Sequence, residues 1–237
     1  MKKLLTIAVA SFAMAAVADY TAPQIGVTTI TATAKNTIIP VPFKALSNGT
    51  SNITVTDLVK TNSLPDHTWL LSYNGTAYNS WEYSSGVWTP GTYAGETGIS
   101  PTPGAANATL ACGSAIWIVL PTANSYNTSV TVYGAYATGV TSAVAAGGEN
   151  GVATLVANPL QGEANITVTP RAGDQIIIPN TETMYTYRTK KDGSAGTWRY
   201  DGAAVATLPS FDVGQGFWYV RAAGGSATEI TWALKQQ

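Results

Sequence analysis

Short stretches of this chain alternate aliphatic residues with threonine, serine or asparagine, a period of two that is typical of β-strands. At 52–56 the sequence is Asn-Ile-Thr-Val-Thr, which predicts a strand with one buried face. The stretches 116–120 and 217–220 are short, rich in aromatic and β-branched residues and bounded by Gly or Pro, which favours strands buried on both faces. After the N-terminal segment no helical period is sustained, and threonine is abundant. The pattern predicts an all-β chain.

Dipeptides typical of tight turns separate several of the expected strands. Asn74-Gly75 and Asp192-Gly193 have strand-like flanks, and Ser85-Gly86 and Asp201-Gly202 form a second pair. Such dipeptides are favoured in hairpins because they accept positive φ angles. The sheets are therefore expected to be antiparallel.

The mature sequence repeats itself with a period of about a hundred residues, too long for a solenoid. Four blocks recur in the same order: 52–56 with 165–169, 81–86 with 198–202, 113–119 with 214–220, and 130–133 with 229–232. We therefore expect two tandem, homologous antiparallel domains, each a β-sandwich or barrel, that follow a cleaved signal peptide.

The first residues have the pattern of a bacterial signal peptide. Lys2 and Lys3 precede an apolar run over 4–17, and Ala16-Val17-Ala18 matches a small-x-small cleavage site. A membrane anchor or a buried helix is the alternative. The predicted divisions are a signal peptide (1–18), a first β-domain (19–138, with a surface loop inserted at 89–108), a linker (139–151) and a second β-domain (152–237).

Charge is scarce in this chain. Charged residues make up 11% of the sequence, the net charge is -1, and the basic residues are spread out. Nucleic acids and anionic lipids need clustered Lys and Arg, so neither is an expected partner. No segment after the signal is long and apolar enough to span a membrane. The expected location is outside the cytoplasm: extracellular, at the cell surface or in the periplasm.

The residue types that perform chemistry are few. His67 and Cys112 are the only histidine and cysteine, too few for the usual zinc sites. Cys112 lies in an apolar stretch and is expected to be buried, with an intermolecular disulfide or a dyad with His67 as alternatives. Glu82, Glu96 and Glu163 match no recognisable glycosidase pattern. We therefore expect no catalytic residues, no metal site and no cofactor, and the chain is not expected to be an enzyme.

Aromatic residues are the most suggestive feature for binding, with 7 Trp and 12 Tyr against 4 Phe. Trp and Tyr combine an apolar face with a polar edge, which suits wet interfaces and sugars. The repeated tryptophans are expected to be core because they serve what both copies share. The unrepeated Tyr78, Trp88 and Tyr93 are the candidate ligand-binding residues, expected in a flat surface row.

One motif carries a resemblance to a known group of proteins. Gly214-Gln215-Gly216-Phe217-Trp218-Tyr219 stands near the end of the second copy, before a last strand at 229–232. It resembles the Gly-x-Gly-Phe-Trp-Tyr motif of uncharacterised exported β-proteins of verrucomicrobial-type bacteria. The first copy departs from the motif, with Ala115 in place of the second Gly. The resemblance implies export and β-structure, with no activity attached.

These features predict an exported structural or interaction protein of the bacterial cell envelope or exterior. Its expected partners are further copies of itself or other envelope proteins, reached through exposed strand edges. The alternative is a carbohydrate-binding module that uses the aromatics of the first domain to hold a polysaccharide. A hydrolase with scattered carboxylates ranks third.

Overall fold

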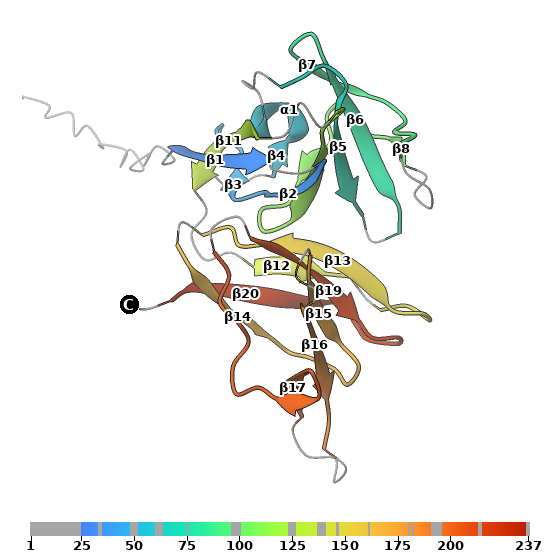
Figure 1. The fold of residues 1–237 in the computed structure, drawn as a ribbon, viewed down its shortest axis with the longest axis vertical. Coiled ribbons are helices and arrows are strands. Elements are labelled where there is room, and N and C mark those ends of the chain that lie inside the picture. Colours follow the sequence, from blue (N-terminus) through green and yellow to red (C-terminus); the bar gives the residue numbers. More distant parts are fainter. Residues whose placement is uncertain are drawn as a thin grey trace, which may run out of the picture.

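The structure, a computed structural model, describes residues 25–32, 35–47, 52–59, 64–74, 76–95, 101–122, 127–136, 141–145, 147–160, 162–179, 181, 183–190, 196–212 and 215–235. The described residues form β-strands and one short helix, α1 (Val55–Leu58), which confirms the all-β prediction. Figure 1 shows two bodies, one above the other. We call residues 25–136 the first half and residues 141–235 the second half. The predicted signal peptide, 1–18, lies outside the described residues.

The first half contains a three-stranded and a larger sheet, with the strand orders β1-β11-β3 and β2-β10-β5-β6-β7. Short β8 pairs in parallel with β6, and β4 pairs with β9. The strands are β1 (Ile25–Ala32), β2 (Asn36–Pro40), β3 (Phe43–Lys44), β4 (Ile53–Thr54), β5 (Thr68–Tyr73), β6 (Tyr78–Ser84), β7 (Val87–Pro90), β8 (Thr102–Pro103), β9 (Thr109–Leu110), β10 (Ala115–Val119) and β11 (Thr128–Tyr136).

The two sheets of the first half pack face to face. Ile116 and Ile118 of β10 and Val130 and Val132 of β11 are fully buried in one cluster between the sheets. The residues between them on each strand point to the opposite faces, as the period of two requires. A β-sandwich is the result, and the apolar stretch 116–120 lies at its centre as expected.

The second half has the same strand order with one further strand, β18, at the end of the large sheet: β12-β20-β14 and β13-β19-β15-β16-β17-β18. Phe217 and Tyr219 of the large sheet and Ile230 and Trp232 of the small sheet are buried in one cluster. The strands are β12 (Thr141–Val144), β13 (Val152–Ala157), β14 (Ala164–Val168), β15 (Gln175–Ile178), β16 (Thr183–Arg188), β17 (Thr197–Tyr200), β18 (Ala203–Ala204), β19 (Gly216–Arg221) and β20 (Thr228–Leu234).

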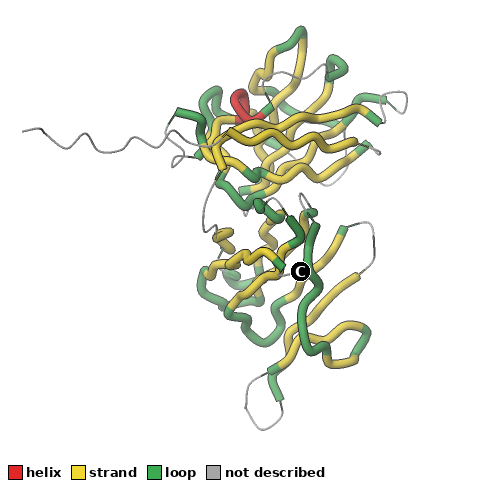
Figure 2. The backbone as a smooth tube through the Cα atoms, turned by 90° about the vertical axis from the view of Figure 1, so that its left-hand side faces the viewer, coloured by secondary structure: helices red, strands yellow, loops and turns green. Residues whose placement is uncertain are grey.

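The two halves meet through the large sheets (Figures 1 and 2). Ser114 forms an antiparallel bridge with Val156, and the amide of Ala157 donates to the carbonyl of Gly113 at 3.2 Å. Trp218 packs edge-on against Tyr73 with the ring centroids 5.6 Å apart. Alternate positions of β10 and β19 thus face the other half, which explains why these strands are apolar on both faces.

Two predicted turns are tight hairpins. Ser85-Gly86 joins β6 to β7, and Asp201-Gly202 joins β17 to β18, each as a two-residue loop with both φ angles positive. This is the backbone of a type I′ turn. At Asn74 the connection between Tyr73 and Tyr78 has four residues, and the Asn74 side chain accepts from the amides of Thr76 and Ala77. Asp192-Gly193 lies outside the described residues.

The identical strings at 52–56 and 165–169 adopt different structures. In the first, β4 ends at Thr54, whose hydroxyl accepts from the amide of Asp57 at 3.1 Å and caps α1. In the second, the residues continue as strand β14. The prediction of a strand through Val55 is therefore wrong, because Asp57 completes a helix-capping sequence that the second string lacks.

Two predicted connections are also more structured than expected. Within the predicted linker, 141–144 form β12, which pairs with β20. Within the predicted surface loop 89–108, β8 pairs with β6, and Gly104 packs so closely on Trp81 that a Cβ atom would overlap the indole ring. Gly104 allows the close packing of the second segment, although the composition of both segments is typical of loops.

Candidate functional site

The second sandwich is closed on one side and open on the other. Its small sheet has three strands and its large sheet six, so β16, β17 and β18 extend beyond the small sheet. Side chains between the sheets are fully buried on β19 and β20 and only partly buried at Ile166, Tyr185 and Trp198. The overhanging strands therefore expose their inner face.

Four aromatic side chains occupy this inner face, and we call them the aromatic platform: Tyr185, Tyr187, Trp198 and Tyr200. Tyr185 lies opposite Tyr200 and Tyr187 opposite Trp198 in the pairing of β16 with β17, so all four point to one face. The ring centroids are 5.4 Å apart in the first pair and 5.5 Å in the second. Tyr200 is 46% exposed, and burial raises the pKa of Tyr185.

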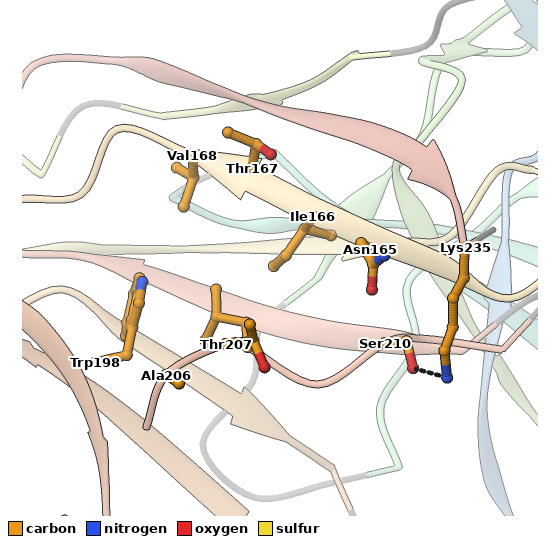
Figure 3. A pocket seen from close by; sticks show the side chains of 10 residues that line it. Asn165, Ile166, Thr167, Val168, Trp198, Ala206, Thr207, Ser210 and Lys235 are labelled. Atoms are coloured by element: carbon orange, nitrogen blue, oxygen red, sulfur yellow. Dashed lines mark hydrogen bonds between the residues drawn. The ribbon is translucent and has the colours of Figure 1, made fainter. Parts of the chain in front are cut away.

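A cleft of about 560 Å³ opens along strand β14, and Trp198 is the platform residue that lines it (Figure 3). This volume lies within the range of ligand sites in proteins. One wall is β14, the floor includes Trp198, and the segment 206–210 forms the opposite side. Aliphatic and polar side chains alternate along both walls, in equal number. The lining residues are Asn165, Ile166, Thr167, Val168, Trp198, Ala206, Thr207, Leu208, Ser210 and Lys235.

One end of the cleft is polar. The Lys235 ammonium donates to Glu163 Oε1 at 2.7 Å and to the Ser210 hydroxyl at 3.4 Å, and Ser210 also donates to Glu163. The hydrogen bond from Lys235 is the largest cause that lowers the pKa of Glu163. The pair is solvated, so it adds little to stability and marks the rim of the cleft.

The edge of β14 that borders the cleft carries open peptide groups. Ala164 exchanges two backbone hydrogen bonds with Phe211, at 2.9 and 2.8 Å, so its peptide groups point away from β20. Alternate residues of a strand point their peptide groups to the same edge, so those of Ile166 and Val168 share this edge. Among the described residues, no backbone partner follows Phe211 along it. Figure 3 shows the chain at Ala206 and Thr207 separated from β14.

The same side of the first sandwich is filled by the chain itself. Tyr83 and Trp88, on β6 and β7, are buried with their rings 5.2 Å apart. They belong to one cluster with the α1 segment, whose Val55 and Leu58 are buried. The Trp88 indole donates to the carbonyl of Val59 at 3.4 Å. The first half thus covers its inner aromatics with residues 53–59, and the second half has no such cover among its described residues.

The structure separates Trp88 from Tyr78 and Tyr93, the other two aromatic residues that the sequence suggested as a binding row. Trp88 is 6% exposed and faces the interior of the first sandwich. Tyr93 is also 6% exposed, and it packs on the outer face of the large sheet against Trp69, 5.5 Å away. Tyr78 is half-buried on that outer face beside Tyr73, and burial raises its pKa. These three side chains therefore do not form an open row.

The repeated tryptophans also differ in burial. Trp81 is 2% exposed as expected for core, whereas Trp198 is half-buried and lines the cleft. Trp117 and Trp218 are half-buried on the outer faces near the contact of the halves. The pattern that could have indicated the platform is Tyr185-Thr-Tyr187 followed by Trp198-Arg-Tyr200, two alternating strands with all their aromatics on one face.

Titratable groups outside the cleft lie apart or serve the fold. Cys112 is 4% exposed, and burial raises its pKa to about 11, so the thiol stays protonated at neutral pH. His67 is an exposed turn residue with φ 65, and its Nδ1 lies 2.6 Å from Glu82 Oε1. Glu96 lies outside the described residues. Within the described part of the chain, no three His, Cys, Asp or Glu side chains come together as metal ligands do.

The buried ionic group of the second half is structural. Asp174 is fully buried, and its carboxylate accepts from Arg221 Nη1 at 2.5 Å and from the Tyr219 hydroxyl at 2.7 Å. The amides of Arg171 and Ala222 donate to it at 2.8 Å. Burial, followed by the hydrogen bond to Asp174, raises the pKa of Tyr219. All these donors converge on one carboxylate, so the group ties β19 to the loop before β15.

Comparison with known proteins yields no relative: no protein-family model, no curated protein and no solved structure matches this chain. The only helix in the described residues, α1, is one turn long, and that part of the chain has no helix of the length and apolarity that a bilayer crossing needs. The site must therefore be interpreted from its own geometry.

Proposed function

We propose that this chain is an exported structural or interaction protein of the cell envelope or exterior, and that it holds its partner in the cleft of the second half. The N-terminal sequence supports export through a signal peptide cleaved after residue 18. The common strand order of the halves supports their origin as two copies of one domain. Two of the four repeated blocks add to this support, because 113–119 and 214–220 overlap the equivalent strands β10 and β19, and 130–133 and 229–232 lie on β11 and β20.

A single observation carries the assignment of the binding surface. Both halves place aromatic rings on the inner face of the sheet that extends beyond the small sheet. The first half buries Tyr83 and Trp88 under its own segment 53–59, whereas in the second half Tyr200 is 46% exposed and Trp198 lines a cleft. Exposed aromatics next to a concave surface are typical of interaction sites.

Self-association of the mature chain (residues 19–237) tests this function directly. Sedimentation velocity over a wide range of protein concentration should show association, and Tyr200→Ser should weaken it. Met184→Ser is the matched control, because Met184 is 45% exposed on the opposite face of the neighbouring strand. A parent chain that stays monomeric, or equal effects of the two variants, would count against the proposal.

A carbohydrate ligand is the second candidate, and the composition of the cleft favours it. Trp198 offers an apolar face, while Thr207, Ser210 and Lys235 offer hydroxyl and ammonium groups around it. Retardation in gels that contain an embedded polysaccharide tests this candidate. The parent should be retarded, Trp198→Ala should migrate freely and Met184→Ser should behave as the parent. Free migration of the parent in every polysaccharide gel removes the candidate.

A further inference from the structure

We propose that the occupant of the second-half cleft is an extended peptide strand, which adds antiparallel to the free edge of β14 and places aliphatic side chains over the aromatic platform. This inference rests on the proposed function of the cleft and names the class of partner.

Hydrogen bonding favours a strand over other ligands. The free edge of β14 offers an N–H and a C=O from each of Ile166 and Val168, two residues apart, which is the spacing of one antiparallel partner strand. Phe211 already forms an antiparallel bridge with Ala164 at the start of this edge. An added strand continues this ladder where the chain at 206–210 leaves it.

The side chains of the cleft favour aliphatic residues in the added strand. Ile166 points between the sheets because it lies opposite the buried Trp232, and Val168 does so because it lies opposite the buried Ile230. Residues directly opposite each other in antiparallel strands point to the same face. The residues of the ligand that bond to Ile166 and Val168 thus direct their own side chains inward, toward Trp198 and Leu208.

The first half supplies an internal precedent for this chemistry. There the inner aromatics are covered by Val55, Leu58 and Val59, all aliphatic and all 3% exposed or less. The second half presents a comparable aromatic surface, so an aliphatic segment from outside would complete the same kind of core.

The occupant must be an isolated segment rather than the edge of another folded sheet. Strands β16 to β18 lie at the end of the large sheet, and β17 faces the cleft across from β14 through Trp198. A second copy that offered its own β14 would also bring its own large sheet up to the cleft, and we infer that the two large sheets would overlap. A single extended strand avoids this overlap, which is the arrangement of peptides that bind by strand addition.

The test uses the mature chain and a fluorescein-labelled octapeptide, Lys-Thr-Val-Thr-Ile-Thr-Val-Lys, in fluorescence polarisation. In the antiparallel arrangement, the aliphatic residues turn their N–H groups to β14 and the threonines turn theirs to solvent. N-methylation of the central Ile should weaken binding about tenfold or more, and N-methylation of the adjacent threonines should leave it nearly unchanged. The unmodified peptide must bind, and Tyr200→Ser must weaken its binding more than Met184→Ser does.

The protein side offers a second, independent readout. Val168→Pro removes an N–H that faces the free edge and leaves the bonds to β20 in place, because Thr167 and not Val168 points to β20. The thermal unfolding midpoint of this variant should stay close to that of the parent. Its affinity for the peptide should be about tenfold lower.

The outcomes separate this inference from the proposed function. Absence of peptide binding, or binding that N-methylation at Ile does not change, overturns strand addition even where Tyr200→Ser still abolishes self-association. A loss caused by N-methyl threonine alone indicates a parallel strand and contradicts the antiparallel arrangement. Retention on a polysaccharide that the peptide does not displace also overturns it.

Discussion

Removal of the Asp174 carboxylate should destabilise the second half more than any other single polar deletion there. Asp174 is fully buried and accepts four hydrogen bonds, from Arg221, Tyr219, Arg171 and Ala222. The Arg221 side chain is 9% exposed. In Asp174→Ala its guanidinium still donates hydrogen bonds to the carbonyls of Ser226 and Thr169, but it loses its counterion. Breaking a buried ion pair in this way costs about 3–5 kcal/mol.

This loss is a large part of the whole stability of a domain, which is about 5–15 kcal/mol. Arg221→Met should also be costly, because it leaves the carboxylate buried with its remaining donors. The double variant, Asp174→Ala with Arg221→Met, removes both charges and should cost clearly less than the sum of the two single changes. The difference is the coupling energy of the pair.

Urea-induced unfolding followed by tryptophan fluorescence measures these free energies, since Trp218 and Trp232 lie in the same half. The dependence of the free energy on urea should stay the same in all four proteins. A cost below about 1 kcal/mol for Asp174→Ala, or strict additivity in the double variant, would refute the account of this buried group.

Three further predictions follow from the described geometry. At pH 8 the Cys112 thiol should react with iodoacetamide about a hundredfold more slowly in the native chain than in the urea-unfolded chain, because burial raises its pKa to about 11 from the ordinary value of 9.0. Equal rates would contradict its burial. Above pH about 10 Tyr219 ionises in the unfolded chain but retains its proton in the folded chain, so the free energy of unfolding falls as the pH rises. Urea titrations at several pH values should show a smaller decline for Tyr219→Phe. Leu58→Ala should cost the first half about 2–5 kcal/mol in urea unfolding, whereas Leu208→Ala, at the open cleft, should cost clearly less; the reverse order would contradict the difference in cover between the halves.

Periodicity and turn residues were sufficient to predict an all-β chain with antiparallel strands. The apolar stretches 116–120 and 217–220 are strands that face both a core and the other half. Ser85-Gly86 and Asp201-Gly202 are tight turns because Gly, Asp and Ser tolerate the positive φ that a type I′ hairpin requires. These properties are local, so they can be read from the sequence.

Alignment of the repeats was less accurate, because strand register depends on partners distant in sequence. The blocks 130–133 and 229–232 belong to equivalent strands, but the inward residues are Val130 and Val132 in one and Ile230 and Trp232 in the other. The predicted alignment is thus shifted by one position, and such a shift moves every side chain to the other face.

The exposure of the aromatics could not be predicted from their own residues. Trp88 is buried because segment 53–59 folds under it, and Trp198 lines a cleft because the chain at 206–210 passes beside it instead of covering it. Both outcomes depend on where a distant segment packs. The strands of the sheet are common to both halves. The burial of the aromatic residues at the end of the sheet depends on the segment that packs against them, which differs between the halves.

Amide hydrogen exchange along β14 tests the central claim most directly. In the free mature chain, the amides of Ile166 and Val168 should exchange fast, because they face an open edge, while those of Asn165 and Thr167 should be protected by β20. Addition of the octapeptide should slow Ile166 and Val168 and leave the other two unchanged. Equal protection of all four amides in the free chain would show that the edge is already paired, and would contradict the open cleft.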